Sequence, residues 1–527
     1  MRSKKLERVV AVGDGLGRQL GLLGRLSACA LGALACASQP VQAQDAGSSA
    51  RGFNLAPRLT SSATISNDIN RQGDGAADGA LILQLSPGLR VSSNSGRVRG
   101  FVDYALSGLG YIKSPVRDQF QNALSASVMA EVIDNWAFVD VTGSITQQAI
   151  SAFGSQVVDG GQGEGNRAEV WTVSVSPSLR GTLGTVARYN ARLTMGATNT
   201  RKSSLADATN TGMQIGISGV NARSLLTWSL DGALQRQSFK EGRSTSNDNL
   251  RGTLRLAAFD DLLLSANAGV DSSNLRSSER EQKGTYGIGL NWTPTERTKL
   301  SLQRDQRFFG ESHSVTFEHR MARSIWRFSD SKDVSNYTGQ SNGGGQGTNY
   351  ELFFALFASQ VPDPAQRQVY VMDYLRNLGL SPTASAAGGF LSSAASVVRR
   401  QELSLALSGV RDTVTLLVSR TENRRLDSLS RVQDDLSDSD VVRQTGLSLG
   451  LSHRLTPQSS ANLTLSQQNT SGALTTQSTT MRSILANWTA NLGARTSVSL
   501  GARYVVFHAE RSPYTEKALF ANLNRQF

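Results

Sequence analysis

The chain is poor in cysteine and in long apolar runs, and each shortage excludes a class of protein. Its only two cysteines, Cys29 and Cys36, lie in an N-terminal segment that we expect to be removed. A mature chain without cysteine can form no disulfide, thiol nucleophile or cysteine-based metal site. Beyond this segment no run of about 18 apolar residues occurs, so the sequence predicts no membrane-spanning helix.

Motifs of enzymatic chemistry are also missing. The four histidines are His313, His319, His453 and His508; none falls in an HExxH motif, and no two have metal-ligand spacing on one strand face. Neither a GxSxG nucleophile elbow nor a phosphate-binding P-loop occurs. We therefore predict no enzyme, no cofactor and no metal. A hydrolase on the outer wall of a barrel is the weakest alternative.

Residues 1–43 have the features of an export signal. Basic residues precede the apolar stretch Leu26–Ala37, and Val41-Gln42-Ala43 supplies small residues before a cleavage site ahead of Gln44. Leu26–Cys29 can also be read as a lipoprotein cleavage box, which Arg25 disfavours because it interrupts the apolar run. The mature chain, 44–527, has no Pro-rich or charged linker, so we predict one large domain.

What the chain does contain is period-two alternation of apolar and polar residues, with a mean hydropathy of −0.26. The clearest runs are 97–111, 250–258, 285–292, 402–409, 461–466 and 496–506. A strand with one apolar and one polar face is typical of a transmembrane antiparallel β-barrel, in which every second residue faces lipid. We predict an all-β barrel of about 22 strands, within a range of roughly 18 to 24.

The connections between these runs alternate in length. The short ones are 94–97, 134–135, 181–185, 221–223, 260–261, 293–297, 411–413, 455–460 and 492–496. The longer, polar ones are 70–79, 151–166, 199–209, 240–249, 272–281, 421–438 and 508–513. Short periplasmic turns and long extracellular loops have this pattern, which places the C-terminus on the periplasmic side.

Tryptophans and the C-terminus support this interpretation. Trp136, Trp228, Trp292 and Trp488 lie near predicted short turns, Trp326 lies before a less certain turn at 329–332, and Trp171 follows a long loop. Interfacial aromatic girdles have such positions. The last strand presents Leu519, Ala521, Leu523 and Phe527 on one parity, like the signal by which the barrel-assembly machinery recognises its clients. Arg525 departs from that signal, because it occupies a position that is usually apolar.

Three residues conflict with a regular barrel. Pro87 and Pro177 lack the N–H that a strand ladder needs, so we expect them at bulges or strand ends. Arg304 lies on the same apolar strand face as Leu300 and Leu302. An arginine that faces lipid at mid-membrane costs about 2–4 kcal/mol. We expect Arg304 near the membrane rim, or a bulge that reverses its parity.

Residues 332–398 break the alternation. Residues 351–357 suggest a strand, and Asp363-Pro364 predicts the start of a helix through Val369, Met372, Tyr374, Leu375 and Leu378, with Gly379 at its end. A barrel of about 22 strands usually has a plugged lumen. This insertion therefore either folds into the pore or forms a helical surface loop.

The charge is basic and carried mainly by arginine. Beyond residue 43 there are 48 basic and 40 acidic residues, and only seven of the basic ones are lysines. The arginines are dispersed along strands, so we predict no nucleic-acid partner. They either line a pore for anions or contact lipopolysaccharide phosphates at the membrane rim. Strand parity predicts Arg188, Arg192, Arg251, Arg255, Arg307 and Arg503 in the lumen, where they would favour an anion such as an acidic polysaccharide.

The acidic residues Asp434, Asp435, Asp438 and Asp440 form one further cluster in or beside a long loop. We expect a solvated surface there; a site for a divalent cation that bridges lipopolysaccharide is the lesser alternative.

Three segments resemble the outer-membrane barrel proteins associated with PEP-CTERM/exosortase systems, which accompany exopolysaccharide gene clusters in Gram-negative bacteria. These are Phe53–Pro57 with Asn67–Asn70 and Leu85–Leu89, then Ala355–Pro364 with Gly388–Leu391, and the terminal strand to Phe527. The resemblance implies an outer-membrane barrel that supports the export or assembly of an exopolysaccharide, and it supplies no catalytic residues. The alternative is a closed structural or adhesive surface barrel.

Overall fold

The computed structural model describes residues 53–69, 79–112, 118–157, 165–203, 205, 207–220, 225–335, 349–357, 361, 363–378, 389–427, 429, 432–473, 477–510 and 513–527. The predicted signal peptide lies outside these ranges. No helix in the described ranges is long and apolar enough to cross a membrane.

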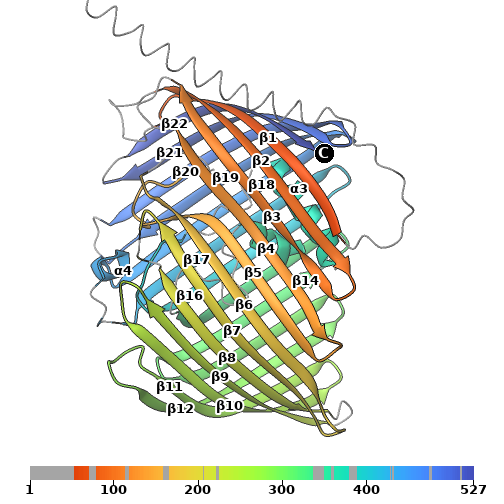
Figure 1. Cartoon of the computed structure of the whole chain (residues 1–527), viewed down its shortest axis with the longest axis vertical. Coiled ribbons are helices and arrows are strands. Elements are labelled where there is room, and N and C mark those ends of the chain that lie inside the picture. Colours follow the sequence, from red (N-terminus) through yellow and green to blue (C-terminus); the bar gives the residue numbers. More distant parts are fainter. Residues whose placement is uncertain are drawn as a thin grey trace, which may run out of the picture. The chain divides into compact units, whose positions relative to one another are not determined.

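The described chain forms 22 strands and three helices (Figure 1). The strands are β1 (Phe53–Ser66), β2 (Ala80–Ser95), β3 (Val98–Ile112), β4 (Gln119–Ile133), β5 (Ala137–Ala149), β6 (Arg167–Leu183), β7 (Ala187–Arg201), β8 (Ala208–Gly219), β9 (Leu226–Phe239), β10 (Ser244–Phe259), β11 (Leu262–Ser273), β12 (Glu281–Thr295), β13 (Thr298–Arg307), β14 (Gly310–Arg320), β15 (Ser324–Ser335), β16 (Ser396–Ser408), β17 (Asp412–Arg425), β18 (Val441–Thr456), β19 (Ser459–Ser471), β20 (Ser478–Gly493), β21 (Thr496–Ala509) and β22 (Tyr514–Gln526). The helices are α2 (Asn349–Leu356), α3 (Pro364–Leu378) and α4 (Asp435–Asp438).

Every strand pairs antiparallel with the next, and β1 pairs with β22, so the sheet closes on itself. The seam is continuous from Arg58 opposite Gln526 to Ser66 opposite Ala518. Closure leaves no strand edge. A barrel wall in lipid requires this, because lipid offers no hydrogen-bond partner to the backbone groups of an open edge. The predicted transmembrane antiparallel barrel and its strand number are confirmed.

The two ends of the barrel differ, as predicted. At the end that carries Phe53 and Phe527, which we call the short-turn end, all connections have two to six residues. The other, long-loop end carries the long connections 67–79, 150–166, 426–440 and 336–395. Two expectations there are wrong. Residues 244–249 begin β10, and 421–425 end β17, because polar residues continue a strand beyond the region that faces lipid.

The wall is inverted relative to a soluble protein. Outward-facing Leu447 and Leu500 are 48% and 49% exposed, whereas inward-facing Asn487 is only 6% exposed. This pattern follows directly from the alternation in the sequence. All six tryptophans are exposed. The turn expected at 329–332 is wrong, because these residues lie within β15; the actual turn is 321–323, and it places Trp326 near the short-turn end.

Both prolines lie in the middle of strands, which corrects the expectation of bulges or strand ends. Pro87 is opposite Leu59 on β1, but the pairing with β3 skips it and resumes in unchanged register at Gly88. Pro177 is likewise paired with Val139 and skipped by β7. Since alternate residues of an antiparallel strand bond to opposite neighbours, a missing N–H interrupts the ladder on one side only.

The insertion between β15 and β16 contains two helices, and residues 332–335 and 396–398 belong to the flanking strands. Helix α3 has the predicted bounds. The strand expected at 351–357 is wrong, because Asn349–Leu356 is the helix α2. Its short apolar run could not be assigned from periodicity alone. Gly379, the expected end of α3, lies outside the described residues.

On the terminal strand, Leu519, Leu523 and Phe527 are exposed on the outer face, together with Ala521. Arg525 keeps this parity, and its guanidinium lies 5.3 Å from the centre of the Phe527 ring. The backbone N–H of Phe527 donates to the carbonyl of Pro57 at 2.9 Å, which joins the chain end to β1.

Candidate functional site: the lumen and its long-loop mouth

The six predicted lumen arginines all lie on inward-facing strand positions, but most of them are paired. Arg192 binds Asp140, Arg251 Nη1 lies 3.3 Å from Asp305 Oδ2, and Arg503 Nη2 lies 2.6 Å from Glu516 Oε1. Arg307 bridges two carboxylates, Asp271 at 3.0 Å and Asp333 at 2.9 Å. Arg255 donates to the Ser229 hydroxyl at 3.1 Å.

Arg188 differs from the other five. Its side chain is exposed near the short-turn end, and no hydrogen bond or ion pair joins it to another residue in the described part of the chain. The lumen is therefore less cationic than the arginine positions alone suggested. Ion pairs offset the charges of Arg192, Arg251, Arg307 and Arg503. Arg188 and Arg255, whose partner is a neutral hydroxyl, retain their attraction for an anion.

The carboxylates that pair with these arginines were not predicted. Asp140, Asp271, Asp305, Asp333 and Glu516 also have inward parity, so the alternation that selects the arginines would have selected them. Which charges meet could not be read from the sequence, because several partners are separated by an intervening strand. Arg192 on β7, for example, reaches past β6 to Asp140 on β5.

Helices α2 and α3 pack on the inner face of the wall (Figure 1). Phe353, Phe357 and Leu375 form a buried cluster with Ala406 of β16, and Leu417 of β17 packs against it. Tyr374 Oη donates to Thr415 Oγ1 at 3.1 Å, and burial raises the pKa of this tyrosine. Ala406 and Thr415 face inward near the short-turn end of β16 and β17. The helices thus lie deep in the lumen, far from where the insertion leaves the wall.

The return segment, residues 390–396, ends on the first residue of β16 and is the most completely buried stretch among the described residues of the insertion. Its members are Phe390, Leu391, Ser392, Ser393, Ala394, Ala395 and Ser396, each 3% exposed or less. The Leu391 N–H donates to the carbonyl of Ala149 at 3.1 Å, and the Ala395 carbonyl accepts from Leu426 at 2.9 Å. The segment therefore joins the β5 end of the wall to the β17 end at the long-loop mouth.

Apolar side chains from separate loops complete this junction. Phe390 packs with Ala152 of the β5–β6 loop and with Leu436 of α4. Leu391 packs with Phe239 of β9. Ala395 packs with Leu275 and Phe308, from the β11–β12 and β13–β14 connections. Three separate apolar clusters at the mouth are thus connected through the one return segment.

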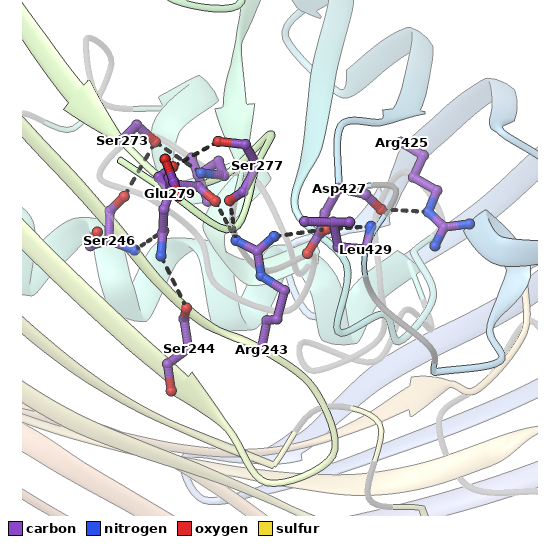
Figure 2. Close-up of polar contacts among 11 residues, drawn as sticks. Arg243, Ser244, Ser246, Ser273, Ser277, Glu279, Arg425, Asp427 and Leu429 are labelled. Atoms are coloured by element: carbon purple, nitrogen blue, oxygen red, sulfur yellow. Dashed lines mark hydrogen bonds and ion pairs between the residues drawn. The ribbon is translucent and has the colours of Figure 1, made fainter. Parts of the chain in front are cut away.

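Buried polar contacts fix the same junction. Arg243, in the β9–β10 turn, lies 3.4 Å from Asp427 across 184 positions of sequence, and it also donates to the carbonyls of Asn274 and Ser277 (Figure 2). Asp427 Oδ1 accepts from the Leu429 N–H at 2.9 Å. The Asp427 side chain is only 2% exposed, so a cationic partner is needed to hold its charge there.

The acidic cluster is part of this junction rather than a solvated surface, which corrects the expectation for Asp434 and Asp435. Asp434 caps α4 and accepts from Ser392 Oγ at 2.6 Å. Asp435 accepts from Ser151 Oγ at 2.8 Å and from the Ala152 N–H at 2.5 Å. Burial raises the pKa of Asp435, with a further contribution from Asp434 and Asp438. Asp438 and Asp440 are exposed.

The histidines make separate contacts. His313 lies 3.1 Å from Asp330, His453 lies 2.6 Å from Asp412, and His319 lies 2.8 Å from the Thr298 hydroxyl. Among the described residues, none of these contacts joins a histidine to a carboxylate and a hydroxyl at once. No group of three or more potential metal ligands occurs in the ranges that the structure describes.

No protein-family model matches the chain, and no curated protein matches its sequence. Solved structures share the barrel at low identity. The FrpB iron transporter from Neisseria meningitidis (F5-1 variant, apoprotein form) is 11% identical, with a TM-score of 0.49 over 90% of this chain and 81% of that one. A ferric enterobactin receptor (PfeA) mutant from Pseudomonas aeruginosa is 9% identical, with a TM-score of 0.42 over 89% and 80%. An anion-selective porin from Comamonas acidovorans is 10% identical, with a TM-score of 0.33 over 90% and 99%.

Proposed function

We propose that the protein is an outer-membrane β-barrel that supports export or assembly of an exopolysaccharide, as a pore held closed by its own insertion. The outward apolar face, the exposed tryptophans and the closed 22-stranded sheet support placement in the outer membrane, with the long-loop end outside the cell. The resemblance to barrels that accompany exopolysaccharide gene clusters supports the substrate.

The observation that carries the pore hypothesis is the path of the insertion. It leaves the wall at the long-loop end and packs α2 and α3 on inward-facing residues near the short-turn end. It then returns through the buried segment 390–396 at the mouth. β15 and β16 pair along their length, so a short turn could join them, and their pairing does not require a connection that occupies the lumen at two levels. We infer that it regulates passage.

The inner wall suits an acidic polysaccharide better than a neutral one. Inward-facing arginines offer charge-assisted hydrogen bonds to carboxylates, and Arg188 is available for such a contact without the loss of an existing one. Arg192 and Arg251, whose side chains are 42% and 26% exposed, can exchange a wall carboxylate for a carboxylate of the passing chain, so the substrate would bind weakly and move on.

Single-channel conductance in planar bilayers tests this proposal. The full mature barrel is compared with a variant in which residues 336–395 are replaced by a short Gly/Ser turn between β15 and β16. Heat-modifiable gel mobility serves as the folding control for both proteins. A large anion-preferring conductance in the replacement variant alone supports a pore closed by the insertion. Silence of both folded proteins would instead support the closed structural or adhesive barrel.

A further inference from the structure

A row of basic and acidic side chains crosses the outer wall from β13 to β18. In register, Arg304 lies opposite His313, His313 opposite Lys332, Lys332 opposite Arg399, Arg399 opposite Glu422, and Glu422 opposite Arg443. Adjacent strands are separated by about 4.8 Å, so this row spans about 24 Å of the barrel surface. At its two ends the register continues to Ile288 on β12 and Ser471 on β19.

The row faces outward and lies beyond the apolar belt. Four positions nearer the short-turn end, the same strands present Phe317, Phe328, Leu403, Val418 and Leu447 on the same parity. Phe317, Val418 and Leu447 are exposed, as lipid-facing residues are. No register shift occurs in the β13–β14 pairing, so Arg304 keeps its outward parity and lies near the long-loop end of β13. The rim position predicted for Arg304 is therefore the correct alternative.

Cations outnumber anions on this surface. Its basic residues are Arg304, Lys332, Arg399, Arg420, Arg424 and Arg443, and its carboxylates are Glu311, Asp330 and Glu422. All three carboxylates are in ion pairs. Glu311 pairs with Arg304 at 3.0 Å, Asp330 with Arg399 at 2.8 Å, and Glu422 with Arg443 at 3.0 Å and Arg424 at 3.2 Å.

Two cations of the surface have no protein partner. No hydrogen bond or ion pair to the Lys332 ammonium or the Arg420 guanidinium occurs within the residues that the structure describes. Arg420 lies one pair of residues nearer the apolar belt than Arg399, beside Gln401. The carboxylates hold neighbouring guanidiniums in fixed positions across β13–β18, and the two unpaired cations lie among them. Several cations held at fixed positions can bind one anion that carries several negative charges, and such an anion would satisfy them better than water does.

We propose that the outer wall of β13–β18 binds the phosphate groups of a phosphorylated glycolipid in the outer leaflet. The acyl chains would pack on the apolar belt below the row, and the phosphates would meet Lys332, Arg399, Arg420 and Arg443. The inference rests on the membrane placement in the proposed function, but not on export. A variant can therefore lose lipid binding and keep its conductance, and a barrel without conductance can still bind the lipid.

The test measures binding of bisphosphorylated lipid A to the folded full-length mature barrel in detergent, by native mass spectrometry and by the shift of Tm. The row variant carries Lys332→Gln, Arg399→Gln and Arg443→Gln. The matched control carries Arg297→Gln, Arg411→Gln and Arg495→Gln, three exposed arginines in turns at the short-turn end. Both variants lose the same charge, and heat-modifiable mobility confirms that both are folded.

We expect the row variant to bind lipid A more weakly by about tenfold for each lost phosphate contact, and the control to bind like the wild type. Lipid A without its phosphates, and inorganic phosphate alone at the same concentration, should not raise the Tm of the wild type. Replacement of Arg399 and Arg443 by lysine should restore most of the affinity, because the charges remain. Equal losses in the row and control variants, or none in the row variant, would overturn the proposal.

Discussion

Arg243 and Asp427, 184 positions apart, form an ion pair that joins the β9–β10 turn to the β17–β18 loop across the mouth of the barrel. It belongs to a junction in which the return segment 390–396 is the centre. Strand pairing alone would leave these loops independent. The return segment holds these loops in one arrangement, and the proposed regulated pore requires such a discrete arrangement.

Removal of this ion pair should loosen the mouth without disturbing the wall. Arg243→Ala leaves the buried Asp427 carboxylate with only the Leu429 N–H, at a cost of about 1–3 kcal/mol. We expect faster hydrogen exchange at Leu429 and Leu391, with unchanged exchange in the strands. Arg236→Ala, which breaks an exposed pair with Asp248, is the matched control and should change neither segment.

The aromatic cluster should hold α3 against the wall. Tyr374→Phe loses one hydrogen bond to Thr415, worth about 1 kcal/mol, whereas Tyr374→Ala also empties a site in the cluster and costs about 3–5 kcal/mol. Limited proteolysis of the insertion should therefore accelerate slightly in the first variant and strongly in the second. Equal protection of both variants would show that α3 is held elsewhere.

The mouth should close more firmly as the pH falls. Because the pKa of Asp435 is raised above its ordinary value of 3.8 in the junction, the closed state binds the proton more tightly than an open, solvated state. Stabilisation is complete below the ordinary pKa and is lost as the pH rises through the raised one. The distribution of distances between spin labels at Ser155→Cys and Gln433→Cys should become narrower on acidification. Asp435→Asn should remove most of that change.

Two lumen arginines should differ in what they control. Arg188→Gln removes an unpaired cation, so in the insertion-replaced barrel it should lower anion preference, measured as a reversal potential, and leave stability unchanged. Arg307→Gln leaves Asp271 and Asp333 without their bridge, so it should destabilise the barrel by about 3–5 kcal/mol against denaturant. A loss of stability in Arg188→Gln together with an unchanged stability of Arg307→Gln would contradict the ion pairs described above.

The terminal strand should matter for assembly more than for stability. Phe527→Ala removes an exposed ring on the outer face, and only its backbone N–H bonds to Pro57. We expect less folded barrel in the cell envelope but a near-normal unfolding midpoint after refolding from urea. A midpoint shift as large as the loss in yield would assign Phe527 a structural role instead.

The sequence by itself determined the wall. Alternation selects which residues face lipid, because side chains of a strand point alternately to its two faces, and this property is local. The strand number and the inward positions of Arg188 and Arg503 follow from it. The two kinds of ends follow from the lengths of the connections, and the bounds of α3 follow from the Asp363-Pro364 start and the helical spacing after it. The apolar run at 351–357 is too short to distinguish a helix from a buried strand, so α2 was missed.

Only the tertiary structure decided what the charges and loops do. The register of neighbouring strands brings Arg307 on β13 between Asp271 on β11 and Asp333 on β15. Closure of the sheet places the β5–β6 loop against Asp435 of α4. Such contacts depend on which strands curve toward one another, and no local pattern contains that information. Strand register likewise aligns the residues from Arg304 to Arg443 in one row, which the sequence does not reveal because each member comes from a different strand.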